Sequence, residues 1–303
     1  MKQLHFGATT IPALAVGCMR IADKTPKEAQ ALVSAALDEG ISFFDHADIY
    51  GGGKSEEVFA GAVRALGVRR EDMFVQTKCG IRKGMYDFSK EHILASVEGS
   101  LKRLGTDYVD ALLLHRPDTL MEPEEVAEAF ALLRREGKVR AFGVSNFSPM
   151  QIEVLRQATG ENLRFDQLQF GLAHTGMIDE GLNVNIACDL GATRTGGVLE
   201  YCRLNGIIIQ AWSPFQYGMF KGVFWENPDY AQAVKELDEL AAAYGITREA
   251  MAIAWILRHP AGMQVICGTT NAKRLLQLAK AVDVKITREE WYRVYLAAGN
   301  PLP

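Results

Sequence analysis

The chain alternates short, almost continuously apolar segments with longer segments whose apolar residues recur at helical spacing. Continuous apolar runs such as ALLLH and GIIIQA are typical of strands that are buried on both faces. Because eight strands alternate with helices, the pattern favours an α/β fold, and specifically a closed parallel (β/α)8 TIM barrel. The predicted strands are residues 14–17, 41–45, 73–78, 109–115, 139–145, 164–170, 206–212 and 263–268.

The helical segments begin with recognisable caps. Thr25 with Glu28, and Ser148 with Gln151, form capping-box patterns, and each has a proline at the first helical position. These signals place helix starts directly after predicted strands and their loops. The strand–loop–helix order of the barrel model therefore agrees with the local signals.

The remaining segments are expected to close or line the barrel. The first residues, KQLHFGATTIPAL, predict a short N-terminal β-hairpin that turns at Gly7 and covers the barrel floor. Residues 171–195 and 213–229 are predicted as long cofactor or substrate loops, since long connections in compact domains are often functional. No linker-like composition interrupts the chain, so we expect a single barrel domain over residues 1–303.

Composition narrows the function classes. The 303 residues carry a net charge of −4, which argues against a nucleic-acid partner because such binders present a basic face. The five cysteines are odd in number and scattered, so we expect free thiols in a reducing cytoplasm. No apolar run approaches the roughly 18 residues of a membrane span, and no apolar stripe suggests self-association. We therefore expect a cytoplasmic monomer without a membrane partner.

Chemically useful side chains follow the predicted strands. Asp45 ends one strand and Tyr50 follows it, Lys78 ends the next, and His115 ends the third. In a (β/α)8 barrel the C-terminal strand ends meet at one mouth, where the active site is built. An open doubly wound sheet would need a glycine-rich dinucleotide turn, and the sequence contains none.

Together these four groups suit the reduction of a carbonyl. A tyrosine hydroxyl has an ordinary pKa of roughly 10, and a neighbouring ammonium such as that of Lys78 lowers the pKa. Asp45 would keep Lys78 charged, and Tyr50 would act as the general acid. His115 would either donate a hydrogen bond to the substrate oxygen or share the proton relay with the phenol. Each residue alone also has an ordinary structural reading, as a loop aspartate, packed aromatic, solvated lysine or core histidine. Their joint occurrence at successive strand ends favours catalysis.

The motifs DHADIYGGGKSEE, TKCG, LLLHRPD, GVSNF, QAWSPF and CGTTNAKR together resemble the aldo-keto reductase superfamily, and among its members the bacterial general aldo/keto reductases. The resemblance runs over nearly the whole chain in the family's order. It implies a barrel that binds a nicotinamide nucleotide without a Rossmann fold. It also implies that Asp45, Tyr50, Lys78 and His115 form the catalytic tetrad.

The resemblance assigns further residues to the cofactor. Ser145, Asn146 and Gln167 match residues that hydrogen-bond the nicotinamide carboxamide, with Gln169 as the less favoured alternative to Gln167. Trp212 stands where the family usually stacks a tyrosine on the nicotinamide ring, and it keeps a large π surface. The other expected cofactor contacts are Gly17, Met19, Arg20, Asp45, Ser213, Pro214, Phe215, Gly218 within segment 216–220, Gly268, Thr269, Thr270, Arg274 and Gln277.

The choice of cofactor depends on the segment GTTNAKR. Free backbone N–H groups at a helix start and the guanidinium of Arg274 suit a phosphate. The resemblance implies that this segment binds the 2′-phosphate of NADPH. Two positions depart from the family pattern: Gly268 stands where NADPH-preferring members often carry lysine, and Gln277-Leu278 replaces a Glu-Asn pair. We expect NADPH, with NADH as a possible second cofactor.

The sequence therefore predicts an NADP(H)-dependent oxidoreductase that reduces small aldehydes or ketones. The alternative is a nucleotide-binding regulatory or redox-sensor barrel with little turnover. We expect no metal, because the six histidines are isolated, and we interpret Cys79 as a packing residue. Arg116 either favours an anionic substrate or pairs with Asp118.

Overall fold

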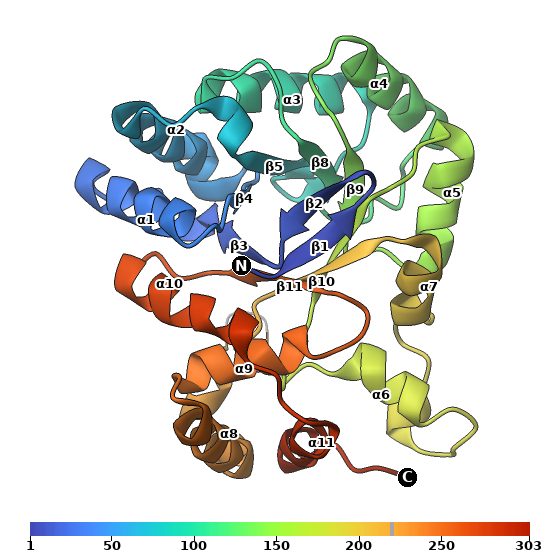
Figure 1. Ribbon diagram of the computed structural model, residues 1–303. Coiled ribbons are helices and arrows are strands. Elements are labelled where there is room, and N and C mark those ends of the chain that lie inside the picture. The colour runs from blue at the N-terminus through green and yellow to red at the C-terminus, as the bar shows by residue number, and fades with distance from the viewer. Residues whose placement is uncertain (219–220) are drawn as a thin grey trace.

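A computed structural model describes residues 1–218 and 221–303, and it contains the predicted closed barrel of eight parallel strands (Figure 1). The strand order around the barrel is β10-β11-β12-β3-β4-β5-β8-β9. Each strand lies at a predicted segment, and most end within it. The strands are β3 (Leu14–Gly17), β4 (Phe43–Asp45), β5 (Phe74–Cys79), β8 (Ala111–Leu114), β9 (Phe142–Ser145), β10 (Phe165–Gln169), β11 (Ile208–Trp212) and β12 (Gln264–Cys267).

Helices surround the barrel (Figure 1). The capping boxes predicted at Thr25 and Ser148 are both present, with reciprocal hydrogen bonds to Glu28 and Gln151. The helices are α1 (Pro26–Asp38), α2 (Lys54–Leu66), α3 (Lys90–Leu104), α4 (Pro123–Arg135), α5 (Pro149–Thr159), α6 (Gly176–Leu182), α7 (Val198–Asn205), α8 (Ala231–Tyr244), α9 (Arg248–Leu257), α10 (Ala272–Ala279) and α11 (Arg288–Ala297).

The predicted N-terminal hairpin lies across the barrel floor (Figure 1). It consists of β1 (Gln3–Phe6) and β2 (Thr9–Pro12), paired antiparallel around Gly7, whose φ of 61° suits glycine. The Phe6 ring lies 5.2 Å from that of Phe165 and 5.5 Å from that of Phe74. The hairpin is therefore held by aromatic packing against the N-terminal ends of barrel strands.

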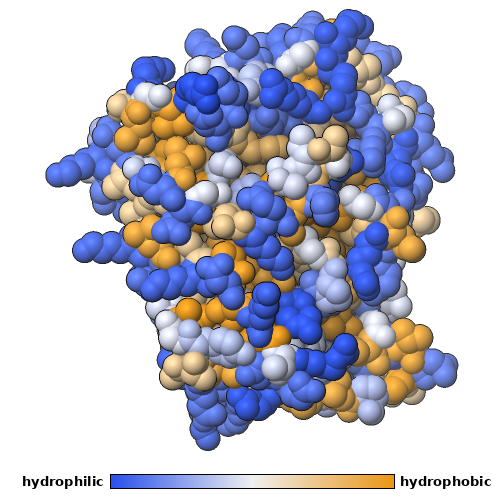
Figure 2. Space-filling view, in the orientation of Figure 1, coloured by the Kyte–Doolittle hydropathy of each residue, from blue (hydrophilic) through white to orange (hydrophobic). Residues whose placement is uncertain are grey.

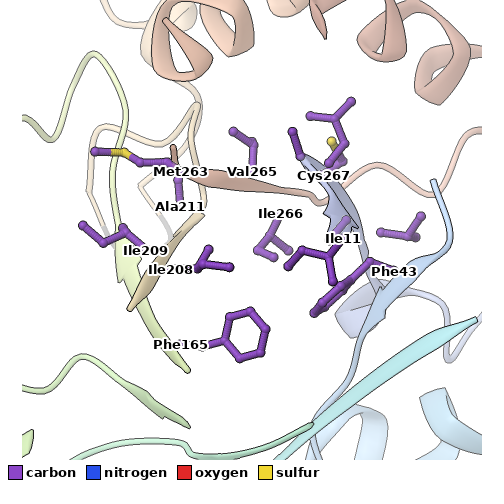
Figure 3. Close-up of a cluster of buried hydrophobic side chains, with 14 of the residues drawn as sticks. Ile11, Phe43, Phe165, Ile208, Ile209, Ala211, Met263, Val265, Ile266 and Cys267 are labelled. Carbon is purple, nitrogen blue, oxygen red and sulfur yellow. The ribbon is translucent and has the colours of Figure 1, made fainter. Parts of the chain in front are cut away.

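The lower interior of the barrel is apolar. Phe43 stacks on Phe74 at 4.4 Å and meets Phe165 edge-on at 6.0 Å. Figure 3 shows Phe43, Phe165 and Ile208 gathered inside the barrel, all of them buried. Polar interior side chains begin only at the next inward-facing position along the strands, closer to the mouth.

The two connections predicted as long loops contain regular structure of their own. Residues 171–195 contain helix α6, in which Glu180 is buried and its carboxylate accepts backbone N–H groups of Arg194, Thr195 and Gly197. In the second connection, Gln216 and Val223 form an antiparallel bridge. The short α6 was missed because its acidic residues face inward, which reverses the usual helical pattern.

Among the described residues, no single helix is long and apolar enough to cross a membrane. The adjoining segments Pro228–Tyr244 and Arg248–Leu257, bent by 92°, pass that test together on length and composition alone. Figure 2 shows hydrophilic residues spread over the hairpin side of the molecule with hydrophobic residues among them. All five cysteines are free, as expected.

Candidate active site

Four side chains from successive elements gather at the C-terminal end of the barrel. Asp45 ends β4, Lys78 lies near the end of β5, and His115 directly follows β8. Tyr50 begins the short 3-10 helix η2 (Tyr50–Gly53), whose glycines have positive φ angles that turn the chain into α2. The sequence-predicted quartet is thus brought to one place by three strands and one turn.

Lys78 is fully buried and uses all three of its donors. Its Nζ lies 2.8 Å from both carboxylate oxygens of Asp45, and it donates to the His46 carbonyl at 2.8 Å. Its third hydrogen bond joins it to the Tyr50 hydroxyl at 3.1 Å. Burial alone would lower the pKa of Lys78, but the Asp45 carboxylate and Tyr50 outweigh burial and raise it. Lys78 is therefore an ammonium group.

The pKa of Tyr50 differs from the expectation. Burial raises the pKa of Tyr50 above its ordinary value, and the opposing effect of Lys78 is smaller. The expected direction of the lysine effect is present, but the expected net lowering of the pKa was wrong. The reason is desolvation, because burial destabilises the Tyr50 phenolate by more than the charge of Lys78 stabilises it.

His115 faces Tyr50 across the mouth. Their ring centroids lie 6.0 Å apart, with the rings nearly perpendicular at 82°. Burial, and then the charges of Lys78 and Arg116, hold the pKa of His115 well below its ordinary value, so the imidazole is neutral. Its Nδ1 is buried without a hydrogen-bond partner among the described residues. The Nε2 is therefore the nitrogen available to a substrate oxygen.

A second group of predicted residues is joined by hydrogen bonds at the ends of β9 and β11. Ser145 Oγ donates to the Gln167 carbonyl at 2.9 Å, and Asn146 Nδ2 donates to Ser145 Oγ at 2.8 Å. Trp212 Nε1 donates to Asn146 Oδ1 at 3.2 Å. Asn146 and Ser213 have φ values of 63° and 47°, which non-glycine residues rarely adopt. Such strain concentrates at functional sites.

The two candidate glutamines of β10 have different surroundings. Gln167 is buried, and its Nε2 donates to Asp45 Oδ1 at 3.1 Å and to Gln210 Oε1 at 3.0 Å. The Nε2 of Gln169, one inward-facing position nearer the mouth, is buried without a partner among the described residues. Gln167 therefore has only its amide oxygen left for the predicted carboxamide contact, whereas Gln169 keeps a free donor.

The structure brings together predicted cofactor residues from the first and last barrel strands. Arg20 Nη2 donates to the Gly268 carbonyl at 2.7 Å. Gly17 ends β3 so close to β12 that a Cβ there would lie 2.9 Å from the Ile266 side chain, so only glycine fits. Met19 and Arg20 are exposed beside this contact. An exposed guanidinium is thus held over the loop that leads into α10.

The start of α10 has the expected exposed cation. Asn271 caps the helix by accepting the backbone N–H of Arg274 at 3.0 Å. Arg274 and Gln277 are exposed, and Thr269 and Thr270 are partly exposed. Leu278, which replaces the family's asparagine, is buried and contributes packing instead.

The segment after β11 carries the remaining predicted contacts. Pro214 is buried, and Ser213, Phe215 and Gly218 are partly exposed. Met219 and Phe220, at the end of the predicted segment 216–220, lie outside the described residues.

Two side chains beside the quartet were open questions. Both carboxylate oxygens of Asp118 accept backbone amides, from Phe88 and Leu120. Arg116 has no ion pair within the described part of the chain, and its guanidinium lies 5.6 Å from the Trp212 ring. The Arg116–Asp118 pair is therefore absent.

Cys79 is buried, and burial raises the pKa of its thiol well above the ordinary value, which fits packing rather than nucleophilic attack.

Sequence analysis missed the residues that lie beneath the quartet. Gln76, Gln210 and Gln264 are buried in the barrel interior, where Gln76 and Gln210 hydrogen-bond each other and Gln76 donates to Asp45. The sequence did contain a signal for this layer, because several predicted strands each carry one glutamine at an inward-facing position. A single glutamine in an apolar strand does not reveal this layer.

Comparison with known proteins gives one consistent result. The model of the aldo/keto reductase family matches residues 13–295. A 6-dehydroglucose reductase of Agrobacterium fabrum is 36% identical over 288 residues, covering 91% of this chain and 90% of the relative.

Two solved structures have the same fold. The thermostable aldo-keto reductase Tm1743, in complex with the inhibitor epalrestat, has a TM-score of 0.79 and 27% identity, and the match covers 98% of this chain and 100% of that one. An aldo/keto reductase from Klebsiella pneumoniae, in complex with NADP and acetate, has a TM-score of 0.79 and 25% identity, over 100% of this chain and 97% of that one.

Proposed function

Because the chain belongs to the aldo/keto reductase family, we propose that it reduces small aldehydes or ketones to alcohols with NADPH, and that Tyr50 donates the proton. The observation that carries this proposal is the contact of 3.1 Å between Lys78 Nζ and the Tyr50 hydroxyl, beside His115 at the barrel mouth. A protonated tyrosine, a fixed ammonium and a neutral imidazole are the groups that carbonyl protonation requires.

The residues present fit a nicotinamide nucleotide. Trp212 offers a partly exposed ring, and Asn146, in strained backbone geometry, is held against it by a hydrogen bond. The buried donor of Gln169 lacks a protein partner among the described residues, as expected of a group that meets a ligand. When bound, the nucleotide supplies the hydride.

The protein's own part is to position and to protonate. His115 Nε2 donates a hydrogen bond to the carbonyl oxygen, which directs that oxygen toward Tyr50. Tyr50 gives up its proton as negative charge develops on the oxygen, and Lys78 stabilises the phenolate that forms. Asp45 keeps Lys78 charged and in place, as the hydrogen bond of 2.8 Å indicates.

NADPH is the proposed cofactor. The solved relative from Klebsiella pneumoniae is in complex with NADP. In this chain the exposed guanidiniums of Arg20 and Arg274 supply positive charge around the loop from Gly268 to Asn271. Guanidinium groups suit phosphate better than they suit a ribose hydroxyl, so these residues favour the phosphorylated nucleotide.

Turnover is the decisive test. Purified protein is mixed with NADPH and an activated aldehyde such as 4-nitrobenzaldehyde, and cofactor absorbance is followed. Steady multiple turnover supports the reductase, whereas tight nucleotide binding without turnover supports the regulatory barrel. A competitive panel of carbonyl compounds then ranks the substrates.

We also propose that the whole chain forms one barrel domain and acts as a cytoplasmic monomer. The family model that matches residues 13–295 supports the single domain. Light scattering during size exclusion tests the oligomeric state, since a dimer would have twice the chain's mass of 33.4 kDa.

A further inference from the structure

A layer of polar side chains fills the barrel interior one inward-facing position below Lys78. Asp45 of β4 lies opposite Gln76 of β5, and Gln210 of β11 lies between Gln167 and Gln264 in register. All five side chains are buried, with exposed fractions of at most 4%. The layer lies between the aromatic floor of the barrel and the side chains of Lys78, Tyr50 and His115 at the mouth.

Two amides of this layer donate to the same oxygen, Asp45 Oδ1. Gln76 Nε2 lies 2.6 Å from Asp45 Oδ1, and Gln167 Nε2 lies 3.1 Å from the same oxygen. Gln210 holds both amides, because its Oε1 accepts Gln76 at 2.9 Å and Gln167 at 3.0 Å. Gln210 Nε2 also donates back to Gln76 Oε1 at 3.1 Å. The two side chains are therefore joined by two hydrogen bonds across the barrel interior.

Stability alone does not explain such a layer. Barrel interiors are usually filled by branched apolar side chains, and burying amides costs free energy unless every group is satisfied. This chain uses aromatic rings for that purpose directly below, at Phe43, Phe74 and Phe165. The amides appear where Asp45 must be held, and two of them donate to its carboxylate.

We propose that Gln76 and Gln210 are positioning residues for carbonyl reduction: they fix the plane of the Asp45 carboxylate so that it holds Lys78 against Tyr50. The inference rests on the proposed reductase function. Gln76 makes the shortest hydrogen bond to Asp45 and Gln210 orients Gln76. Without them the carboxylate can turn about its side-chain torsions, and the Lys78 ammonium follows it away from the phenol.

The layer provides its own matched control. Gln264 is as buried as Gln76 and also bonds Gln210, but its Nε2 donates to the Pro12 carbonyl at 2.7 Å and has no contact with Asp45. Gln76→Met and Gln264→Met both exchange a buried amide for an apolar side chain of similar length. A structural role affects both variants alike, whereas a positioning role affects only Gln76→Met.

The expected result is a kcat loss of about ten-fold to a hundred-fold for Gln76→Met, with the KM and the NADPH dissociation constant changed less than about two-fold. The alkaline limb of its pH–rate profile moves to higher pH, because a displaced Lys78 no longer favours the phenolate. Gln264→Met keeps the wild-type kcat and profile. Gln210→Met, a second variant in case Gln76→Met fails to fold, shows the same shift.

Equal losses in Gln76→Met and Gln264→Met, or an unshifted profile, would overturn the proposal. A readout independent of turnover keeps it separable from the proposed function. Tyrosinate absorbance of each protein, minus that of its Tyr50→Phe counterpart, reports the ionisation of Tyr50 directly. Gln76→Met must raise that ionisation pH even if wild-type protein reduces no tested carbonyl; if it does not, the positioning role is wrong.

Discussion

The ammonium nitrogen of Lys78 lies 3.1 Å from the hydroxyl oxygen of Tyr50, although burial still holds the pKa of Tyr50 above its ordinary value. These two facts are complementary for a proton donor. The raised pKa keeps Tyr50 protonated at neutral pH until a carbonyl oxygen gains charge. The fixed ammonium then stabilises the phenolate, so its electrostatic contribution grows as the proton leaves.

Replacing Tyr50 by Phe removes the proposed proton donor and keeps the ring. We expect kcat for an activated aldehyde to fall by about 10²-fold to 10⁴-fold, while NADPH binding changes little. Stopped-flow turnover and nucleotide fluorescence titration measure the two quantities separately. Unchanged turnover would remove Tyr50 from its role, and a loss of both quantities would indicate a damaged fold instead.

Lys78→Met tests the ammonium itself. Loss of the cation leaves Tyr50 with its burial uncompensated, so the rate should fall by orders of magnitude and the alkaline limb of the pH profile should move upward. The change also leaves Asp45 buried without its counter-ion, which typically costs about 3–5 kcal/mol of stability. Circular dichroism during urea unfolding establishes whether the variant is folded at the assay temperature. An increase in KM at constant kcat would contradict the proposal that Lys78 stabilises the Tyr50 phenolate.

The quartet could be predicted from the sequence because strand ends are visible in the apolar pattern. Asp45, Lys78 and His115 each close or follow an apolar run, and parallel barrel topology then brings them together. Spacing places Tyr50 in the turn after Asp45. None of these inferences required side-chain positions.

The amide layer and the pKa of Tyr50 could not be predicted in the same way. Gln76 and Gln210 lie on strands that pair with different neighbours, so their hydrogen bond depends on the closed barrel. The direction of the Tyr50 shift depends on a difference between two opposing effects, burial and the Lys78 charge. A sequence shows that both groups exist but not how deeply they are buried.

Arg274→Ala tests recognition of the 2′-phosphate. The exposed guanidinium on α10 should attract NADPH more than NADH, so the variant should lose about ten-fold or more in NADPH affinity and little in NADH affinity. Lys273→Ala, an adjacent exposed cation on the same helix, is the control for net charge. Titration calorimetry with both nucleotides gives the ratio of the NADPH affinity to the NADH affinity. Equal weakening of the two cofactors would show that Arg274 does not bind the phosphate.

Asp166 should make the stability of the protein depend on pH. The carboxyl is fully buried on β10, and burial raises its pKa from 3.8 to about 8, opposed by the backbone amides of Phe147 and Asn146. Between these two values the native state binds more protons than the unfolded chain. The free energy of unfolding therefore falls as pH rises through this window, by up to about 1.4 kcal/mol per pH unit, and levels off above the folded-state pKa.

Asp166→Asn removes this titration and keeps the shape of the side chain. Relative to wild type, the variant should gain stability as pH rises from about 4 to about 8, and the difference should then remain constant. Urea unfolding at closely spaced pH values measures it, with Asp229→Asn, an exposed aspartate, as the control. Parallel pH profiles for wild type and Asp166→Asn would mean that Asp166 is ionised in the native protein. That result requires a cation or water to reach its Oδ2, which has no hydrogen-bond partner among the described residues.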